Sequence, residues 1–172
     1  AASDVYKRQG TQFTLREVLY RTINISDNCG YYMLVDRFGR DGYNRWLDSL
    51  GVQYLHLLRP TSNWTSVCTR DLAIIWNEIY SYYQTGTLTA KTMFNYFLNA
   101  QYNYLKVLLP GYQIAHKSGW TQTTFNDAGI VLEHSEGPYL IAILTSDREG
   151  NILCPLAKYL DEIMVDYFNW LD

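Results

Sequence analysis

The pattern of apolar and polar residues predicts helices in the first half of the chain. Thr14 and Glu17 have the spacing of a capping box, and the apolar residues after them recur at helical spacing up to the polar stretch 24–28. Two further helical patterns follow, and each ends at a glycine, first Gly39 and then Gly51. We therefore expect three short helices before residue 52.

The strongest helical pattern begins at Thr69, which we expect to be its N-cap. From Leu72 its apolar residues recur at the i, i+3, i+4, i+7 spacing of a helix with one buried face. Thr89 is expected to cap the next helix. Turn-forming residues in 52–66 predict a loop, and residues 102–110 are expected to link the helices to the strands that follow.

Three apolar segments in the second half predict strands at 113–120, 127–132 and 139–145. Because their connections are short, neighbouring strands should pair antiparallel. Pro155 suits the first turn of a final helix. The apolar stripe of that helix, expected to pack on the sheet, is Leu153, Leu156, Leu160, Ile163, Met164, Tyr167 and Phe168. This order predicts an α+β fold: a helical layer beside a three-stranded antiparallel sheet, with a C-terminal helix packed on the sheet.

The composition fits one folded domain. The chain has 172 residues, of which 48% are hydrophobic and 16% aromatic, so it can bury a core rather than remain disordered. Residues 1–10 show no apolar periodicity and lead directly into the first helix cap. We interpret 1–10 as a tail or an artefact and 11–172 as the domain, here a partial one for the reason given below.

Charge and apolar runs exclude two kinds of partner. The formal net charge of −3 provides no basic surface for nucleic acid. No apolar run approaches the roughly 20 residues that cross a bilayer, so no transmembrane segment is expected. Neither the three cysteines nor the three histidines have the spacing of a metal site, and no metal or cofactor is implied.

Two tripeptides carry the candidate chemistry. Ser-Asp-Asn at 26–28 lies at the joint between two predicted helices, and Lys-Ser-Gly at 117–119 lies on a predicted strand. Either tripeptide alone is most often a plain helix cap or strand end. Their occurrence in this order and in these structural contexts favours a shared active site.

With these motifs the chain resembles the serine β-lactamase and penicillin-binding-protein superfamily, in particular its class A β-lactamase-like branch. The resemblance spans about residues 13–172 and implies a β-lactamase/transpeptidase-like fold. It also implies a ligand of the β-lactam or peptidoglycan-like amide class. Further segments similar to the family are 14–17, 69–73, 109–111, 116–120, 126–131 and 137–139.

The resemblance implies a role for each residue of the first motif. Ser26 would relay a proton to the leaving nitrogen of the substrate. Asn28 would bind the amide side chain of the substrate and the catalytic lysine of the family. Asp27 would hold the loop in shape, which is a structural role.

The resemblance implies that the second motif contacts the substrate and its negatively charged groups. Lys117 would add positive potential, and Ser118 would donate a hydrogen bond to the substrate carboxylate. Gly119 would let the ligand approach the strand closely. The backbone N–H of Trp120 would be one of the two donors that stabilise the oxyanion.

The chain departs from the family because it lacks the Ser-x-x-Lys motif that carries the nucleophile. No serine stands three residues before any of its five lysines, and only 25 residues precede Ser26. We therefore expect a C-terminal fragment of a longer protein, without the N-terminal strands and the nucleophile helix, and inactive alone. Whole members of the family are generally exported, so the longer protein is expected in the cell envelope or outside the cell.

A second departure concerns the omega loop, where class A β-lactamases carry a general-base glutamate. The stretch 58–68 contains no acidic residue, while Asp48 precedes it and Asp71 follows it. The complete protein could therefore be a slow hydrolase, a penicillin-binding-like protein or an inert relative.

The missing N-terminal segment also has a consequence for solubility. In the family, that segment adds strands beside the last strand, so 139–145 would have a bare edge here and one face of the C-terminal helix would be uncovered. A long apolar edge invites pairing with another chain. We expect the isolated chain to be poorly stable or to self-associate.

Two other functional classes remain open. In the first, a degenerate site binds a cell-wall peptide without catalysis or serves only as scaffold. In the second, some of the 16 tyrosines form a platform for stacking sugars. Most of these tyrosines lie at helical spacing, which favours core packing.

Overall fold

A computed structural model describes residues 10–57, 65–102, 104–134, 137–147 and 151–171. Residues 1–9 of the predicted tail 1–10, residues 58–64 within the predicted loop 52–66, and Asn103 lie outside the described residues. In chain order the elements are α1 Leu15–Asn24, α2 Asn28–Phe38, α3 Asp41–Ser49, α4 Thr69–Gln84, α5 Leu88–Leu98, α6 Tyr104–Leu108, β1 Ile114–Trp120, β2 Phe125–Val131, β3 Tyr139–Thr145 and α7 Leu153–Leu171. The predicted α+β architecture is confirmed.

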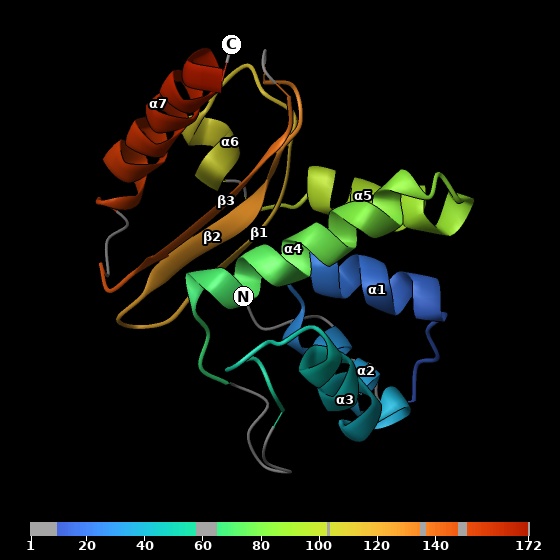
Figure 1. The fold of residues 1–172 in the computed structure, drawn as a ribbon. Helices are drawn as coiled ribbons and strands as arrows, with labels where there is room; N and C mark the ends of the chain where they lie inside the picture. The colour runs from blue at the N-terminus through green and yellow to red at the C-terminus, as the bar shows by residue number, and fades with distance from the viewer. Residues whose placement is uncertain (1–9, 58–64, 103, 135–136, 148–150, 172) are drawn as a thin grey trace.

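The three strands form one antiparallel sheet in the order β1-β2-β3. Helices α6 and α7 cover one face, α4 and α5 cover the other, and α1 to α3 lie beyond α4 and α5 (Figure 1). Side chains alternate between the two faces of a strand. Successive residues of β1 therefore belong to different cores or sites.

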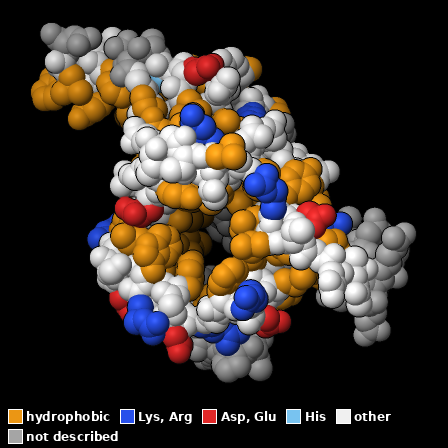
Figure 2. All heavy atoms as spheres, turned by 90° about the vertical axis from the view of Figure 1, so that its right-hand side faces the viewer, with side chains coloured by type: hydrophobic (Ala, Val, Ile, Leu, Met, Phe, Trp, Pro, Cys, Tyr) orange, Lys and Arg blue, Asp and Glu red, His pale blue; other side chains and the backbone are white. Residues whose placement is uncertain are grey.

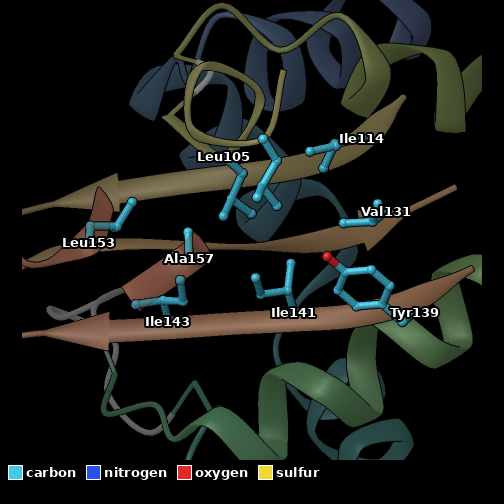
Figure 3. Close-up of a cluster of buried hydrophobic side chains, with 9 residues drawn as sticks. Leu105, Ile114, Val131, Tyr139, Ile141, Ile143, Leu153 and Ala157 are labelled. Carbon is cyan, nitrogen blue, oxygen red and sulfur yellow. The ribbon is translucent and has the colours of Figure 1, made fainter. Parts of the chain in front are cut away.

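The core under α6 and α7 is aliphatic. Its buried side chains come from α6, all three strands and α7, and they converge between these elements (Figure 3). They are Leu105, Leu109, Ile114, Val131, Tyr139, Ile141, Ile143, Leu153 and Ala157. Every second residue of β3 from Tyr139 to Ile143 belongs to this core, which is the alternation of a strand with one face on the core.

The core under α4 and α5 is aromatic. Trp76 of α4 and Phe97 of α5 pack edge to face with ring centroids 5.0 Å apart. Tyr83 stacks on Phe94 at 4.0 Å, and Ala115 completes the contact with β1. Tyr80 and Tyr83 of α4 pack against this core, as their helical spacing predicted, whereas Tyr82 is exposed.

Helix starts agree with the sequence predictions to within two residues. The capping box of α1 is confirmed, because Thr14 accepts from the Glu17 backbone while the Glu17 carboxylate accepts from the Thr14 N–H at 2.7 Å. The predicted cap Thr89 is wrong: it lies inside α5, and Thr87 caps the helix by accepting from the Ala90 N–H. Gly86 has a φ of 70°, so the chain turns there and the helix begins directly afterwards. The predicted cap Thr69 is also displaced by one residue, since Cys68 occupies the N-cap of α4.

Two further features differ from the sequence predictions because contacts elsewhere in the fold define them. The link 102–110 contains the short helix α6, which packs on the sheet. Strand β2 begins at Phe125 rather than at residue 127, because Phe125 pairs with Trp120 on one side and Thr145 on the other. The sequence pattern of one strand does not show which residues of the neighbouring strands will pair with it.

Helix α7 packs with only part of its apolar stripe. Leu156, Leu160 and Met164 contact the aliphatic core, whereas Ile163 and Tyr167 are exposed. The prediction that the whole stripe packs on the sheet is therefore wrong for these two residues. The stripe is broader than the contact that one small sheet offers.

Apolar surface is also open elsewhere. Within the described residues β3 pairs with β2 alone, so its second edge carries no strand. The face at the right of Figure 1 is hollowed at its centre, and hydrophobic side chains surround the hollow (Figure 2). None of the described helices is long and apolar enough to cross a membrane.

The register of β1 and β2 gives a stability prediction at Gly129, which lies opposite His116. A Cβ there would lie 2.3 Å from the Ala115 carbonyl oxygen and 2.7 Å from the Cβ of His116. We expect Gly129→Ala to lower the free energy of unfolding by about 1–3 kcal/mol, because backbone must move to admit the methyl group. Urea unfolding measures this.

The matched control is Gly42→Ala in α3, where an added Cβ has no neighbour within 4 Å. That change should raise the free energy of unfolding by up to about 1 kcal/mol through helix propensity. Equal effects of the two substitutions would contradict the close strand contact.

Candidate active site

A hydrogen bond joins the two sequence motifs. Lys117 Nζ donates to Ser26 Oγ at 2.7 Å, although the residues are 91 positions apart in sequence. Lys117 reaches Ser26 from the β1 face that α4 and α5 cover. Ser26 has a φ of 57°, which non-glycine residues rarely adopt and which costs free energy. A strained serine held against a lysine is a candidate reactive centre.

Asp27 fixes the backbone that presents Ser26. Its carboxylate caps α2 by accepting from the Cys29 N–H at 2.9 Å, and its second oxygen lies 3.5 Å from Nη1 of Arg21. The Asp27 N–H donates to the Arg21 carbonyl. The joint between α1 and α2 is therefore tied at three points around one buried carboxylate.

Burial lowers the pKa of Lys117, while the negative charge of Asp127 opposes that shift. The ammonium also donates to the Ser118 carbonyl oxygen at 2.9 Å. An ammonium has no acceptor lone pair, so the Ser26 hydroxyl is the acceptor in their contact. The Ser26 proton is then free to point elsewhere.

Ser118 lies on the opposite face of β1 from Lys117. Its hydroxyl donates to the Tyr102 carbonyl oxygen at 3.0 Å, and the residue is buried. The structure thus engages this hydroxyl in fastening the segment before α6 to β1. A role in binding a substrate carboxylate requires the side chain to leave that partner.

The other predicted site residues are accessible. Asn28 is exposed at the first position of α2. A Cβ added to Gly119 would have no neighbour within 4 Å, so space for a ligand exists beside the strand. Trp120 ends β1 and is exposed.

Sequence reasoning missed a buried hydrogen-bonded pair next to the site. His116 Nδ1 lies 3.0 Å and 3.1 Å from the two carboxylate oxygens of Asp127, and both side chains are fully buried. Asp127 also accepts from the Leu105 N–H at 3.2 Å. His116 precedes Lys117, and Asp127 lies opposite Ser118, so the pair fixes the strand that carries the second motif. The pairing follows from the strand register, which brings these two residues onto one face of the sheet and which the sequence pattern of either strand does not reveal.

The acidic residues that flank the predicted omega loop already have partners. Asp71 is buried and accepts from the backbone N–H groups of Gln53 at 3.1 Å and Tyr54 at 2.7 Å. Asp48 lies 2.8 Å from Nε2 of His56. Both carboxylates are therefore engaged by groups other than Ser26. Residues 58–64 of the loop lie outside the described part of the chain.

The three cysteines are half-buried and form no disulfide with one another. Across the described residues, no three His, Cys, Asp or Glu side chains gather as ligands for a metal ion. The candidate site therefore consists of hydroxyl, ammonium, amide and backbone groups.

A family model for the beta-lactamase enzyme family matches residues 3–159 of this chain. The chain belongs to that family. This match covers both tripeptides and the sheet, and it confirms the resemblance to the serine β-lactamase and penicillin-binding-protein superfamily. None of the curated proteins matches the chain.

Solved structures share the β-lactamase-like fold. A mutant of PBP-A, solved as an acyl-enzyme complex with penicillin G, superposes with a TM-score of 0.80 at 23% identity. The alignment covers 97% of this chain and 67% of that one. TLA-3 extended-spectrum beta-lactamase superposes with a TM-score of 0.78 at 20% identity, and the alignment covers 95% of this chain and 69% of that one. A class A beta-lactamase from Mycobacterium abscessus superposes with a TM-score of 0.70 at 17% identity, and the alignment covers 96% of this chain and 69% of that one. This β-lactamase-family chain thus spans about two thirds of the length of these structures.

The buried pair beneath the β-lactamase-like site gives a second stability prediction. Asp127→Ala removes the acceptor of both His116 Nδ1 and the Leu105 N–H, so we expect a loss of about 2–4 kcal/mol in the free energy of unfolding, because buried donors are left without a partner. Thermal and urea unfolding measure it. Asp36→Ala, at an exposed position of α2, is the control and should change stability by less than about 0.5 kcal/mol. Similar losses of unfolding free energy in both variants would contradict a stabilising role of the buried pair.

Asp71 gives a prediction for acid stability. Burial alone would raise the pKa of Asp71, but the N–H groups of Gln53 and Tyr54 outweigh burial and lower this pKa below its ordinary value. The folded state therefore gains stability above the ordinary aspartate pKa, and it loses this gain as the pH falls from about 5 toward 2. We expect Asp71→Asn to be less stable than the wild type at neutral pH and to lose less stability on acidification. Urea unfolding across this pH range tests the difference, and parallel curves would refute it.

Proposed function

We propose that this chain carries the proton-relay and substrate-binding part of a serine acyl-enzyme that reacts with β-lactams or peptidoglycan-type amides. The observation that carries the proposal is the 2.7 Å bond from Lys117 Nζ to Ser26 Oγ. It joins the two tripeptides that the family uses around its nucleophile. Membership of the beta-lactamase enzyme family supports the chemical class.

The geometry suits delivery of a proton to a leaving nitrogen. Acylation forms a bond between a serine oxygen and the amide carbon, and it breaks the C–N bond, so the departing nitrogen needs a proton. Since Lys117 donates to Ser26, the Ser26 O–H can donate to that nitrogen, and a proton from Lys117 can replace the one transferred. The lowered pKa of Lys117 makes release of this proton easier.

The remaining motif residues would hold the substrate. Asn28 would bind its amide side chain, and the backbone N–H of Trp120 would be one donor to the oxyanion. Ser118 would bind the substrate carboxylate after leaving the Tyr102 carbonyl. Asp27 would keep Ser26 in its strained conformation.

We propose further that the nucleophile comes from outside these 172 residues, and that the chain alone is inactive. The sequence contains no Ser-x-x-Lys, and the chain spans 67% of the PBP-A acyl-enzyme. The hollow ringed by hydrophobic side chains in Figure 2 supports a missing polypeptide neighbour, because exposed apolar surface is costly in water.

A second candidate is a non-catalytic module of the same fold that binds a cell-wall peptide or serves as scaffold. The engagement of Asp48 and Asp71 favours it, because these are the acids closest in sequence to the omega loop. Without a base to activate water, an acyl-enzyme would not be hydrolysed and the protein would not turn over.

Covalent labelling separates the two candidates. The 172-residue chain and a form extended by its upstream coding sequence are incubated with a fluorescent penicillin, and intact masses are followed over time. We expect a lasting adduct on the extended form and none on the short form. Lys117→Ala in the extended form should slow labelling by about 100-fold or more.

Lys91→Ala, at an exposed position of α5, is the matched control and should label at the wild-type rate. A transient adduct would indicate fast deacylation by a base other than an omega-loop glutamate. An extended form that carries a serine in place and never labels would exclude the acyl-enzyme and favour the non-catalytic module.

A further inference from the structure

Four aromatic side chains meet at the turn end of β1 and β2. The ring of Trp120 packs edge to face on Tyr102 at 4.7 Å and on Tyr104 at 6.5 Å, and it lies parallel to Phe125 at 6.4 Å. Tyr104 in turn packs on Phe125 at 4.3 Å. We call Tyr102, Tyr104, Trp120 and Phe125 the aromatic cluster. Its mutual contacts hold each ring in a fixed orientation.

The cluster is not sealed in the core. Trp120 is 46% exposed, a large fraction for an indole that touches three other rings. Tyr102, Tyr104 and Phe125 are half-buried beside it. An indole that is supported on one side and open on the other is a ready contact surface, because it binds without losing much conformational freedom.

A turn rich in hydroxyl groups borders the open indole. Thr121 Oγ1 bonds to Thr124 Oγ1 at 2.8 Å and accepts from the N–H groups of Thr123 and Thr124, which orders the turn. Gln122 adds an exposed carboxamide. Hydroxyls and amides can both donate and accept, so this rim offers several uncharged hydrogen-bonding groups around one apolar platform.

The cluster lies on the other side of β1 from the proton-relay site. Trp120 shares its strand face with His116 and Ser118, whereas Lys117 points to the opposite face toward Ser26. Trp120 lies three positions after Lys117 on the strand, which is a distance of about 10 Å along the backbone. Only the backbone N–H of Trp120 is assigned to the oxyanion, so substitution of its side chain tests the aromatic surface apart from Lys117.

We propose that the aromatic cluster and its threonine turn bind a neutral carbohydrate, with one pyranose ring stacked on the indole of Trp120. The apolar C–H face of a sugar ring complements the negative face of an aromatic ring. The sugar hydroxyls then pair with the hydroxyls and the amide of 121–124. The proposal does not depend on the serine chemistry.

Charge selects this ligand class. None of the eight residues of the cluster and the turn carries a formal charge at neutral pH, where a tyrosine phenol is protonated. Burial raises the pKa of Tyr104 further. A charged peptide would gain no ion pair from these eight side chains. Self-association would favour α7 over the aromatic cluster, because α7 offers a broader apolar surface with Tyr159, Tyr167 and Trp170 exposed.

Binding of β-1,4-linked N-acetylglucosamine tetramer and of maltotetraose to the 172-residue chain tests the proposal by titration calorimetry. We expect saturable binding of at least one of these neutral sugars. Trp120→Ala should raise the Kd about tenfold or more, and Trp120→Phe should raise it less because a ring remains. Trp170→Ala removes the exposed indole of α7 and should leave the Kd unchanged, as should Lys117→Ala on the opposite strand face.

Circular dichroism of each variant separates loss of binding from loss of fold. The proposal is overturned if neither sugar binds the wild-type chain, or if a folded Trp120→Ala variant binds as tightly as the wild type. A dimer in light scattering that dissociates in Trp120→Ala would assign the cluster to self-association instead. Penicillin labelling is a separate readout, so its failure leaves this outcome unaffected.

Discussion

The register between β1 and β2 is the constraint on which both the core and the candidate site depend. It sets Gly129 against His116 with no room for a Cβ, and it brings the carboxylate of Asp127 onto Nδ1 of His116. A slip by one residue would exchange the two faces of β1. Lys117 would then enter the aliphatic core, and the bond to Ser26 would be lost.

The two faces of β1 divide the chemistry of this β-lactamase-family chain. Lys117 projects toward the helical layer, where Asp27 and Arg21 hold Ser26 in a strained conformation. Ser118 and Trp120 project toward α6, where Ser118 donates to the Tyr102 carbonyl oxygen and the indole of Trp120 packs on the Tyr102 ring. One short strand thus supports a charged, buried centre on one side and a neutral, open aromatic surface on the other.

Local patterns predicted the elements whose causes are local. The capping box at Thr14 and Glu17 needs only three residues of spacing, and the sequence was sufficient for it. The cap at Thr87 was missed because Thr89 offers the same chemistry two residues later, and the turn at Gly86 decides between them. Helix α6 and the first residues of β2 were missed for another reason. Contacts with other strands and the sheet define them, and no single-segment pattern encodes those partners.

The sequence alone determined the family, the α+β class and the two motifs, because short spacings and the order of elements are properties of the chain itself. Tertiary structure decided that Lys117 touches Ser26, that Asp127 is the buried partner of His116, and that the Ser118 hydroxyl faces away from Lys117. It also decided that Trp120 gathers three rings around it in an open position. These facts depend on strand register and on which helix covers which face, and both follow from packing over the whole domain.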